Sequence, residues 1–257
     1  VLITNLAGAV WEIQGDAPFT YQDYGYALTN RFQNAGTLRK TGGSGATAFA
    51  AQCRFINTGT VALQQGALQF PNGFTSDGTF DLAAGTTVSL DGGTFSFGAG
   101  SLKTGTGELL MDAGSITLTG TVPSFSWTGG TLTDSDFTVA TNATLAISGA
   151  GTKTLIRSTL NNAGTVTWAG TGDLYALANG GGQSVLITNL AGAVWEIQND
   201  APFTYQDYGY ALTNRFHNAG TLRKIAGAGS PTFASQSSFI NAGTVAIQRG
   251  TVVFPSF

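Results

Sequence analysis

The chain has 257 residues, of which 42% are hydrophobic, 10% are charged and 37 are glycine. A chain of this length and hydrophobicity is expected to fold around a substantial core. Its 11 basic and 14 acidic residues give a net charge of −3 without a run of either sign, which argues against nucleic acid as a partner. No stretch of the sequence reaches the roughly 20 apolar residues of a membrane-spanning helix, so we expect no membrane insertion.

The opening of the chain occurs twice. Residues 1–40 return almost unchanged as residues 185–224, and similarity decays gradually after them. We predict that residues 1–184 are one tandem unit and that residues 185–257 begin the next unit, continuous with the first. We also expect the biological chain to continue beyond both ends, or its ends to stack on other copies. Within the 40 residues the copies differ at Gly15/Asn199 and Gln33/His217.

An aromatic-rich segment, residues 16–32, is the first candidate site along the chain, and it recurs as residues 200–216. Tyrosine offers a rigid apolar ring with a polar tip, which suits binding to a glycan or to another protein surface. The alternative is that these rings cover the flank of the fold. We predict adhesion or packing here, with another copy of the chain favoured over surface glycans as the partner. The residues concerned are Phe19, Tyr21, Asp23, Tyr24 and Tyr26, and Phe203, Tyr205, Asp207, Tyr208 and Tyr210.

A short motif follows and organises the rest of the chain. It consists of Asn or another small polar residue, a spacer, Gly-Thr (once Gly-Ser) and an apolar residue, and it starts at positions 34, 57, 76, 91, 112, 128 and 162. Apolar residues alternate after each glycine, as in Val61/Leu63 and Val166/Trp168, which predicts short strands with one buried face. A sandwich or a closed propeller does not account for a coil-level motif and a unit that simply starts again. We therefore predict an all-β fold, a right-handed parallel β-helix (β-solenoid) of irregular coils of about 20–28 residues.

The motif also predicts the corner of each coil. We expect the asparagines to stack there, with their amides bonded to neighbouring backbone, and the glycine to supply a positive φ. The following Thr is expected to face solvent and the next apolar residue the interior. Because stacked coils are about 4.8 Å apart, the 8 to 9 coils of one unit are predicted to span about 40 Å. The asparagines are Asn34, Asn57, Asn162, Asn218 and Asn241.

Cysteine and histidine offer little chemistry. Cys53 and His217 are the only residues of their types, and the other copy has Ser237 and Gln33 at these positions. One His and one Cys do not make an ordinary transition-metal site. We predict no metal site, no cofactor and no nucleophile.

Two other chemistries remain as alternatives. Asp134 and Asp136 are expected to share one face of a strand, with Asp112 one coil below, and such a carboxylate cluster is typical of β-helix enzymes that cleave polysaccharides. Because three acidic residues are more commonly just solvated, we predict that the chain is not an enzyme. Ice binding is a weaker alternative, because flat threonine arrays can match ice but the Thr-x-Thr pairs here are unevenly spaced. Those pairs are Thr117/Thr119, Thr131/Thr133, Thr152/Thr154 and Thr165/Thr167.

With its Asn-x-Gly-Thr-apolar coils, such as "NAGTL" at 34 and "NTGTVAL" at 57, the chain resembles β-strand-repeat proteins of bacterial surfaces, of the autotransporter-passenger and filamentous-haemagglutinin-like adhesin type. The resemblance covers essentially the whole chain, but it lies in a degenerate motif. It implies a right-handed parallel β-helix and a secreted, very long protein that serves as a stalk, adhesin or matrix component. We therefore expect a structural segment of a giant repetitive bacterial protein, located extracellularly or at the cell surface.

Overall fold

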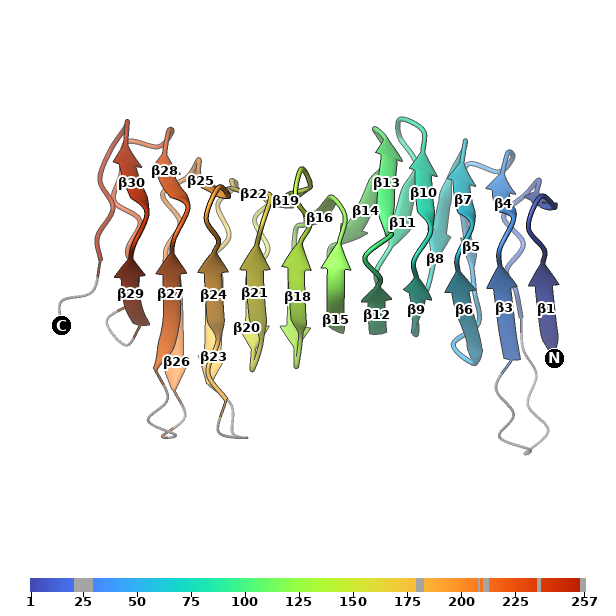
Figure 1. Ribbon diagram of the computed structural model, residues 1–257, viewed down its shortest axis with the longest axis horizontal. Coiled ribbons are helices and arrows are strands. Elements are labelled where there is room, and N and C mark those ends of the chain that lie inside the picture. The colour runs from blue at the N-terminus through green and yellow to red at the C-terminus, as the bar shows by residue number, and fades with distance from the viewer. Residues whose placement is uncertain (21–29, 179–182, 208, 210–212, 235–236, 255–257) are drawn as a thin grey trace. The chain divides into compact units, whose positions relative to one another are not determined.

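The computed structural model describes residues 1–20, 30–178, 183–207, 209, 213–234 and 237–254. The chain divides into two compact units, Val1–Met111 and Asp112–Phe257. Each unit is a parallel β-solenoid, in which successive strands along the chain belong to different ladders and each ladder grows by one strand per coil (Figure 1). The described residues contain no helix, and hence none that is long and apolar enough to cross a membrane. The predicted all-β solenoid is confirmed.

The first unit contains three parallel ladders. One consists of β1 (Leu2–Asn5), β3 (Asn30–Asn34), β6 (Cys53–Asn57), β9 (Gly73–Ser76) and β12 (Gly93–Phe97). The second consists of β2 (Val10–Ile13), β4 (Thr37–Lys40), β7 (Thr60–Leu63), β10 (Thr79–Leu82) and β13 (Leu102–Gly105). The third consists of β5 (Ala46–Ala48), β8 (Ala67–Gln69), β11 (Thr87–Ser89) and β14 (Glu108–Met111).

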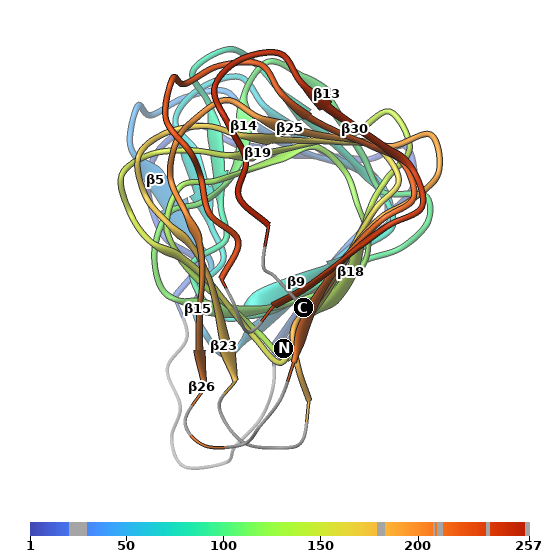
Figure 2. The ribbon, with the colours of Figure 1, turned by 90° about the vertical axis from the view of Figure 1, so that its left-hand side faces the viewer.

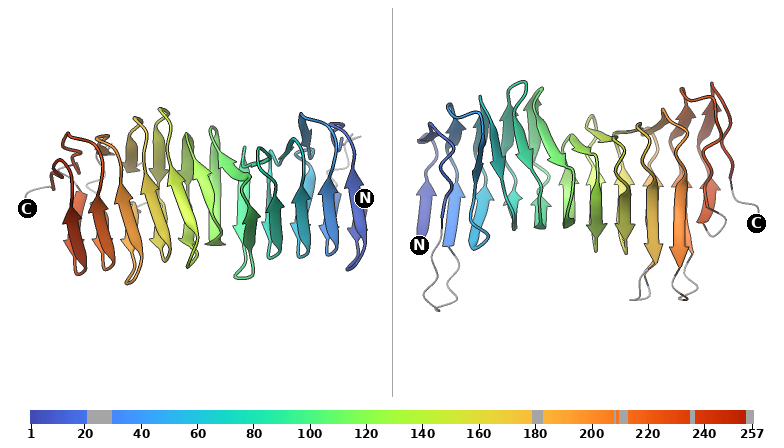
Figure 3. Two further views of the ribbon diagram at one scale, coloured as in Figure 1. Left: turned by 90° about the horizontal axis from the view of Figure 1, so that it is seen from above. Right: turned by 180° about the vertical axis from the view of Figure 1, so that it is seen from behind.

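The second unit is built in the same way. Its first ladder consists of β15 (Ser115–Val122), β18 (Asp136–Val139), β21 (Thr159–Asn162), β24 (Leu186–Asn189), β27 (Asn214–Asn218) and β29 (Ser237–Asn241). The second consists of β16 (Phe125–Trp127), β19 (Thr144–Ile147), β22 (Thr165–Trp168), β25 (Val194–Ile197), β28 (Thr221–Lys224) and β30 (Thr244–Ile247). The third consists of β17 (Gly130–Thr133), β20 (Lys153–Ile156), β23 (Leu174–Ala178) and β26 (Phe203–Asp207). Seen end on, the coils of this unit wind around a common interior (Figure 2), and within each ladder the strands lie side by side (Figure 3).

The interior of each unit is filled by residues that pair in register from coil to coil. In the first unit Leu38 pairs with Val61, which pairs with Phe80, and all three are buried. In the second unit Trp127 pairs with Ile147 and Ile147 with Trp168, again all buried. Strands of period two place every second side chain inside, so the alternation in the sequence becomes a continuous apolar column. The threonines that precede these residues take the outer, half-buried positions.

Stacked asparagines mark one corner of the coil in both units. In the first unit the side chain of Asn5 donates to Asn34 (2.7 Å), Asn34 to Asn57 (2.8 Å) and Asn57 to Ser76 (3.1 Å). Asn5 and Asn34 also bond backbone, Asn5 Nδ2 to the carbonyl of Thr37 at 3.0 Å and Asn34 Nδ2 to that of Thr60 at 2.9 Å. The predicted asparagine corner is confirmed, and its amides bond one another as well as the backbone. In the second unit the ladder runs through Asn162, Asn189, Asn218 and Asn241.

The predicted reason for the motif glycines is wrong at most of them. A Cβ at Gly59 would lie 2.1 Å from the carbonyl oxygen of Gly36, and a Cβ at Gly220 would lie 2.4 Å from that of Ala193. Such contacts show that these glycines let the backbone of one coil approach the next, and no positive φ is involved. A positive φ occurs at the motif glycines Gly93, Gly114 and Gly130, and at Gly192 in the "NLAG" stretch of the second copy. It does not occur at Gly36, Gly59, Gly78, Gly164, Gly220 and Gly243.

The second copy of the opening sequence adds to the ladders that precede it. Strand β24 pairs with β21, so that Leu160 lies beside Ile187 and Asn162 beside Asn189. Strand β25 pairs in the same way with β22, with Val166 beside Trp195. Residues 185–197 therefore stack on the coil before them without a break in register.

Candidate functional site

The most apolar exposed surface among the described residues is one side of the first coil, Val1–Ile13. Strands β1 and β2 each end a ladder, so each has a paired strand on one side only. Trp11 is 38% exposed and Val1 83% exposed. We call this side of Val1–Ile13, together with Phe19 and Thr20, the open face. Its exposed apolar residues are Val1, Leu2, Leu6, Val10 and Trp11.

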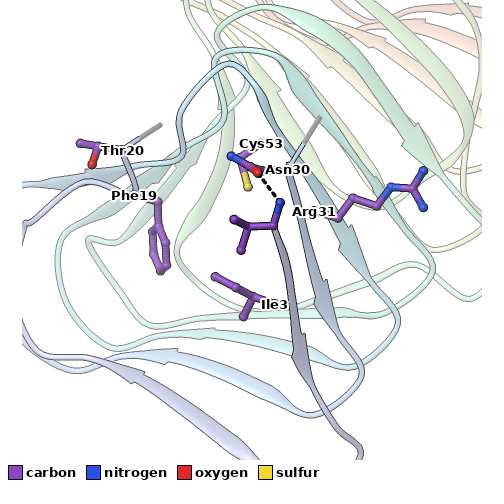
Figure 4. A pocket seen from close by; sticks show the side chains of 7 residues that line it. Ile3, Phe19, Thr20, Asn30, Arg31 and Cys53 are labelled. Carbon is purple, nitrogen blue, oxygen red and sulfur yellow. Dashed lines mark hydrogen bonds between the residues drawn. The ribbon is translucent and has the colours of Figure 1, made fainter. Parts of the chain in front are cut away.

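A pocket of about 320 Å³ opens on this face (Figure 4). Ile3 and Phe19 line it with apolar surface, and the N-terminal amine of Val1 donates to Asn30 Oδ1 at 2.7 Å beside it. Phe19 is half-buried and stacks on Phe49, with the ring centroids 4.5 Å apart. The surface that lines the pocket is therefore mainly apolar. Its lining residues are Val1, Ile3, Phe19, Thr20, Asn30, Arg31 and Cys53.

The second copy carries the same residues in a covered setting. Trp195 is 0% exposed, against 38% for Trp11, and Val185 is 1% exposed, against 83% for Val1. Phe203, the equivalent of Phe19, is also buried. The local sequence is the same, so the difference comes from the coil of residues 158–177, which lies against the second copy.

The aromatic segment predicted as an adhesion site is only partly described. Phe19 and Phe203 face the interior, where Phe203 packs on Phe233 with ring centroids 5.5 Å apart. Tyr205 is half-buried in β26, and Asp207 is the last residue of that strand. Phe203 thus packs in the core, whereas Phe19 is half-buried and lines the pocket on the open face. The other predicted residues, Tyr21, Asp23, Tyr24, Tyr26, Tyr208 and Tyr210, lie outside the described residues.

A buried lysine holds a carboxylate in each copy, and the sequence reading missed both pairs. The side chain of Lys40 is 0% exposed and its Nζ donates to Asp16 Oδ1 at 2.7 Å and to the Gly15 carbonyl at 2.9 Å. In the second copy Lys224 donates to Asp200 Oδ1 at 2.7 Å. The burial of Lys40 could have been predicted, because alternation along "TLRK" places Leu38, and hence Lys40 two residues later, in the interior.

Each of these carboxylates is held in the ionised form. Hydrogen bonding from Lys40, followed by that from the Gly45 amide, lowers the pKa of Asp16 below its usual value. Lys224 and then the Gly229 amide lower the pKa of Asp200 in the same way. Each carboxylate accepts both a lysine and a backbone N–H, so it ties a corner of one coil to the next. These groups therefore have a structural explanation.

The predicted acidic cluster does not form as expected. Asp134 does not share a strand with Asp136, because it lies in the turn between β17 and β18 with a positive φ of 48°. Its carboxylate pairs with Arg157 one coil along, at 2.7 Å and 2.8 Å. This hydrogen bonding by Arg157 lowers the pKa of Asp134. Alternation failed here because the strand breaks at Asp134.

The other residues considered for chemistry are dispersed. Cys53 is half-buried in β6, and burial raises the pKa of its thiol. His217 is half-buried in β27, between Thr188 and Ile240 in the ladder. Among residues that the structure describes, no group of three or more His, Cys, Asp and Glu is placed to hold a metal ion.

The threonine pairs do not build a continuous array on the described strands. Thr167 lies between Ala146 and Glu196 in its ladder. Thr133 lies beside Ile156. At these two positions the threonine column is therefore interrupted in the next coil.

Comparison with protein-family models, curated proteins and solved structures finds no match to this chain.

Proposed function

We propose that the chain is a structural segment of a repetitive extracellular bacterial protein, in which tandem units extend one solenoid that serves as a rod, adhesin stalk or matrix fibre. Its role is mechanical and non-catalytic. The partners that we propose are other copies of the protein, with surface glycans as the second possibility.

The observation that carries this proposal is the stacking of the second copy of the opening sequence. Residues 185–197 continue the ladders of the preceding coil in register, with Asn162 bonded to Asn189 at 2.8 Å. A unit that ends in a surface complementary to its own beginning can be repeated any number of times. Duplication of the unit can then change the length of the solenoid.

The bonding between coils supports a mechanical role. The apolar column, the asparagine ladder and the two lysine–carboxylate pairs all connect one coil to the next, at the interior and at the corners. Neutral amide bonds and buried apolar contacts are little affected by salt. Such a segment is suited to an exterior where ionic strength varies.

Native material tests the proposal. An antibody raised against the chain should label the outside of intact source cells and recognise a species far larger than the 26.4 kDa of this chain. Electron microscopy of that species should show a filament. A compact, intracellular 26.4 kDa protein would contradict both the location and the role.

A length series gives an independent measure. Chains built with one, two and three tandem units should gain about 40 Å of maximum dimension per unit in small-angle scattering, from coils about 4.8 Å apart. A maximum dimension that stays constant as units are added would mean that the units fold back on one another, and a rod or stalk role would then be untenable.

A further inference from the structure

We propose that the open face is a docking surface for a second copy of residues 158–177, which we call the covering coil. The inference rests on the proposed function and deepens it, because it names what binds at the beginning of a unit. The chain contains its own control, because the same sequence occurs once open and once covered.

Backbone hydrogen bonds define the first part of the match. In the second copy the amides of Leu186, Leu190, Val194 and Gln198 donate to the carbonyls of Ser158, Asn162, Gly164 and Trp168, at 2.8–3.0 Å. The corresponding amides in the first copy are those of Leu2, Leu6, Val10 and Gln14, and within the described residues the structure gives no acceptor for them. An unpaired strand edge of this kind is a template for a further parallel strand.

The asparagine ladder supplies the second part. Asn162 Nδ2 donates to Asn189 Oδ1 at 2.8 Å and to the carbonyl of Val194 at 2.9 Å. Asn5 and Val10 hold the equivalent positions on the open face. A covering coil therefore brings one amide that satisfies two acceptors at the corner and fixes the register.

Apolar contacts supply the third part. Val166 pairs with Trp195 and Leu160 with Ile187 in the covered copy. Their counterparts, Trp11 and Ile3, lie on the open face. Burial of the exposed indole and its neighbours provides the hydrophobic contribution to docking, which grows with the apolar surface removed from water.

The pocket at Phe19 is explained by the same comparison. In the second copy β23 runs beside β26, so that Leu174 pairs with Phe203. Leu174 and Ala176 are both buried there. We therefore assign the pocket of about 320 Å³ to this strand of the covering coil rather than to a small molecule.

The test extends the full chain at its N-terminus with a copy of residues 112–184. The four tryptophans make fluorescence specific, because Trp11 is exposed while Trp127, Trp168 and Trp195 are at most 1% exposed. Acrylamide should quench Trp11 in the parent chain, and this component should be lost in the extended chain. The variant Trp11→Phe of the parent identifies the component.

Hydrogen–deuterium exchange gives a second readout on the same molecules. The amides of Leu2, Leu6, Val10 and Gln14 should exchange at least tenfold more slowly in the extended chain. A matched control carries Val166→Asp in the added copy only, and it should restore both quenching of Trp11 and fast exchange. If Trp11 stays quenchable in the extended chain, or if the control is as protected as its parent, the proposal is wrong.

Self-association of the parent chain gives a further decisive outcome. Its own residues 158–177 are already engaged, so Trp11 should remain quenchable as concentration rises. Protection of Trp11 with formation of oligomers would instead assign the face to the C-terminal coil, residues 237–254, and overturn the proposal. These measurements use purified chains and the test of function uses native material, so either can fail without the other.

Discussion

Removing one rung of the asparagine ladder should destabilise the protein by an amount that depends on how many rungs lie beside it. Asn189 and Asn5 occupy equivalent positions in the two copies, within the same sequence "VLITNLAG". Asn189 donates to Asn218 Oδ1 at 2.8 Å and to the Thr221 carbonyl at 3.1 Å, and it accepts from Asn162 at 2.8 Å. Alanine at position 189 therefore removes three hydrogen bonds.

The expected cost follows from these bonds. At about 1 kcal/mol for each bond, with about 1 kcal/mol more for leaving Asn218 Oδ1 buried without that donor, Asn189→Ala should lower the free energy of unfolding by about 4 kcal/mol. Asn5 donates two bonds, to Asn34 at 2.7 Å and to the Thr37 carbonyl at 3.0 Å. Asn5→Ala should therefore cost about 3 kcal/mol at most, and less if the end coil opens locally.

Urea unfolding followed by far-ultraviolet circular dichroism measures both variants against the parent. A third variant, Asn189→Asp, retains an acceptor for Asn162 but cannot donate, so its ionised side chain should be more destabilising than alanine. A cost below about 1 kcal/mol for Asn189→Ala, or a larger cost for Asn5→Ala than for Asn189→Ala, would refute the ladder as a source of stability.

Three further predictions follow from the corners and ion pairs. Gly59→Ala should lower the free energy of unfolding by more than about 3 kcal/mol, because its Cβ would lie 2.1 Å from the Gly36 carbonyl oxygen. A Cβ at Gly85 would have nothing within 4 Å, so Gly85→Ala should cost only about 1–2 kcal/mol, for its positive φ. Equal costs in thermal unfolding would contradict this. For Asp200 the folded pKa is lowered by Lys224, so its stabilisation is present above the usual value of 3.8 and is lost as pH falls through the folded pKa. Acid unfolding should thus be less steep in Asp200→Asn than in the parent, and identical acid curves would argue against it. Asp134→Ala should leave the urea midpoint nearly unchanged, since the Asp134 carboxylate is exposed and surface ion pairs contribute little to stability; a large fall of the midpoint would contradict this.

The fold could be predicted from the sequence because the patterns that determine it involve residues close together in the chain. Alternation after each glycine, as in Val61 and Leu63, decides which side chains are buried, and the repeated motif decides where each coil turns. The role of Gly59 could not be predicted in this way. Its Cβ would contact Gly36, 23 residues earlier in the sequence, and a sequence pattern does not distinguish a glycine needed for close approach from one needed for its φ.

The candidate site was less predictable for a related reason. Phe19 belongs to the predicted aromatic segment, and its β-bridge to Phe49 stacks the half-buried ring on that of Phe49, a contact that the sequence pattern does not indicate. The open face could not be predicted from the sequence, because the residues around the exposed Trp11 are the same as those around the buried Trp195. Exposure here is decided by the neighbouring coil, which no local pattern describes.

The asparagine ladder also explains how coils of unequal length remain in register. Successive bonded ladder residues are separated by 29, 23 and 19 residues in the first unit and by 27, 29 and 23 in the second. Each bond nevertheless joins equivalent corners, so additional residues must be accommodated between corners rather than at them. The separation of 29 occurs in both copies and contains the aromatic segment, residues 16–32 in the first and 200–216 in the second. A change of length between Asn34 and Thr37 would therefore break the ladder, because Asn5 Nδ2 donates both to Asn34 Oδ1 and to the carbonyl of Thr37.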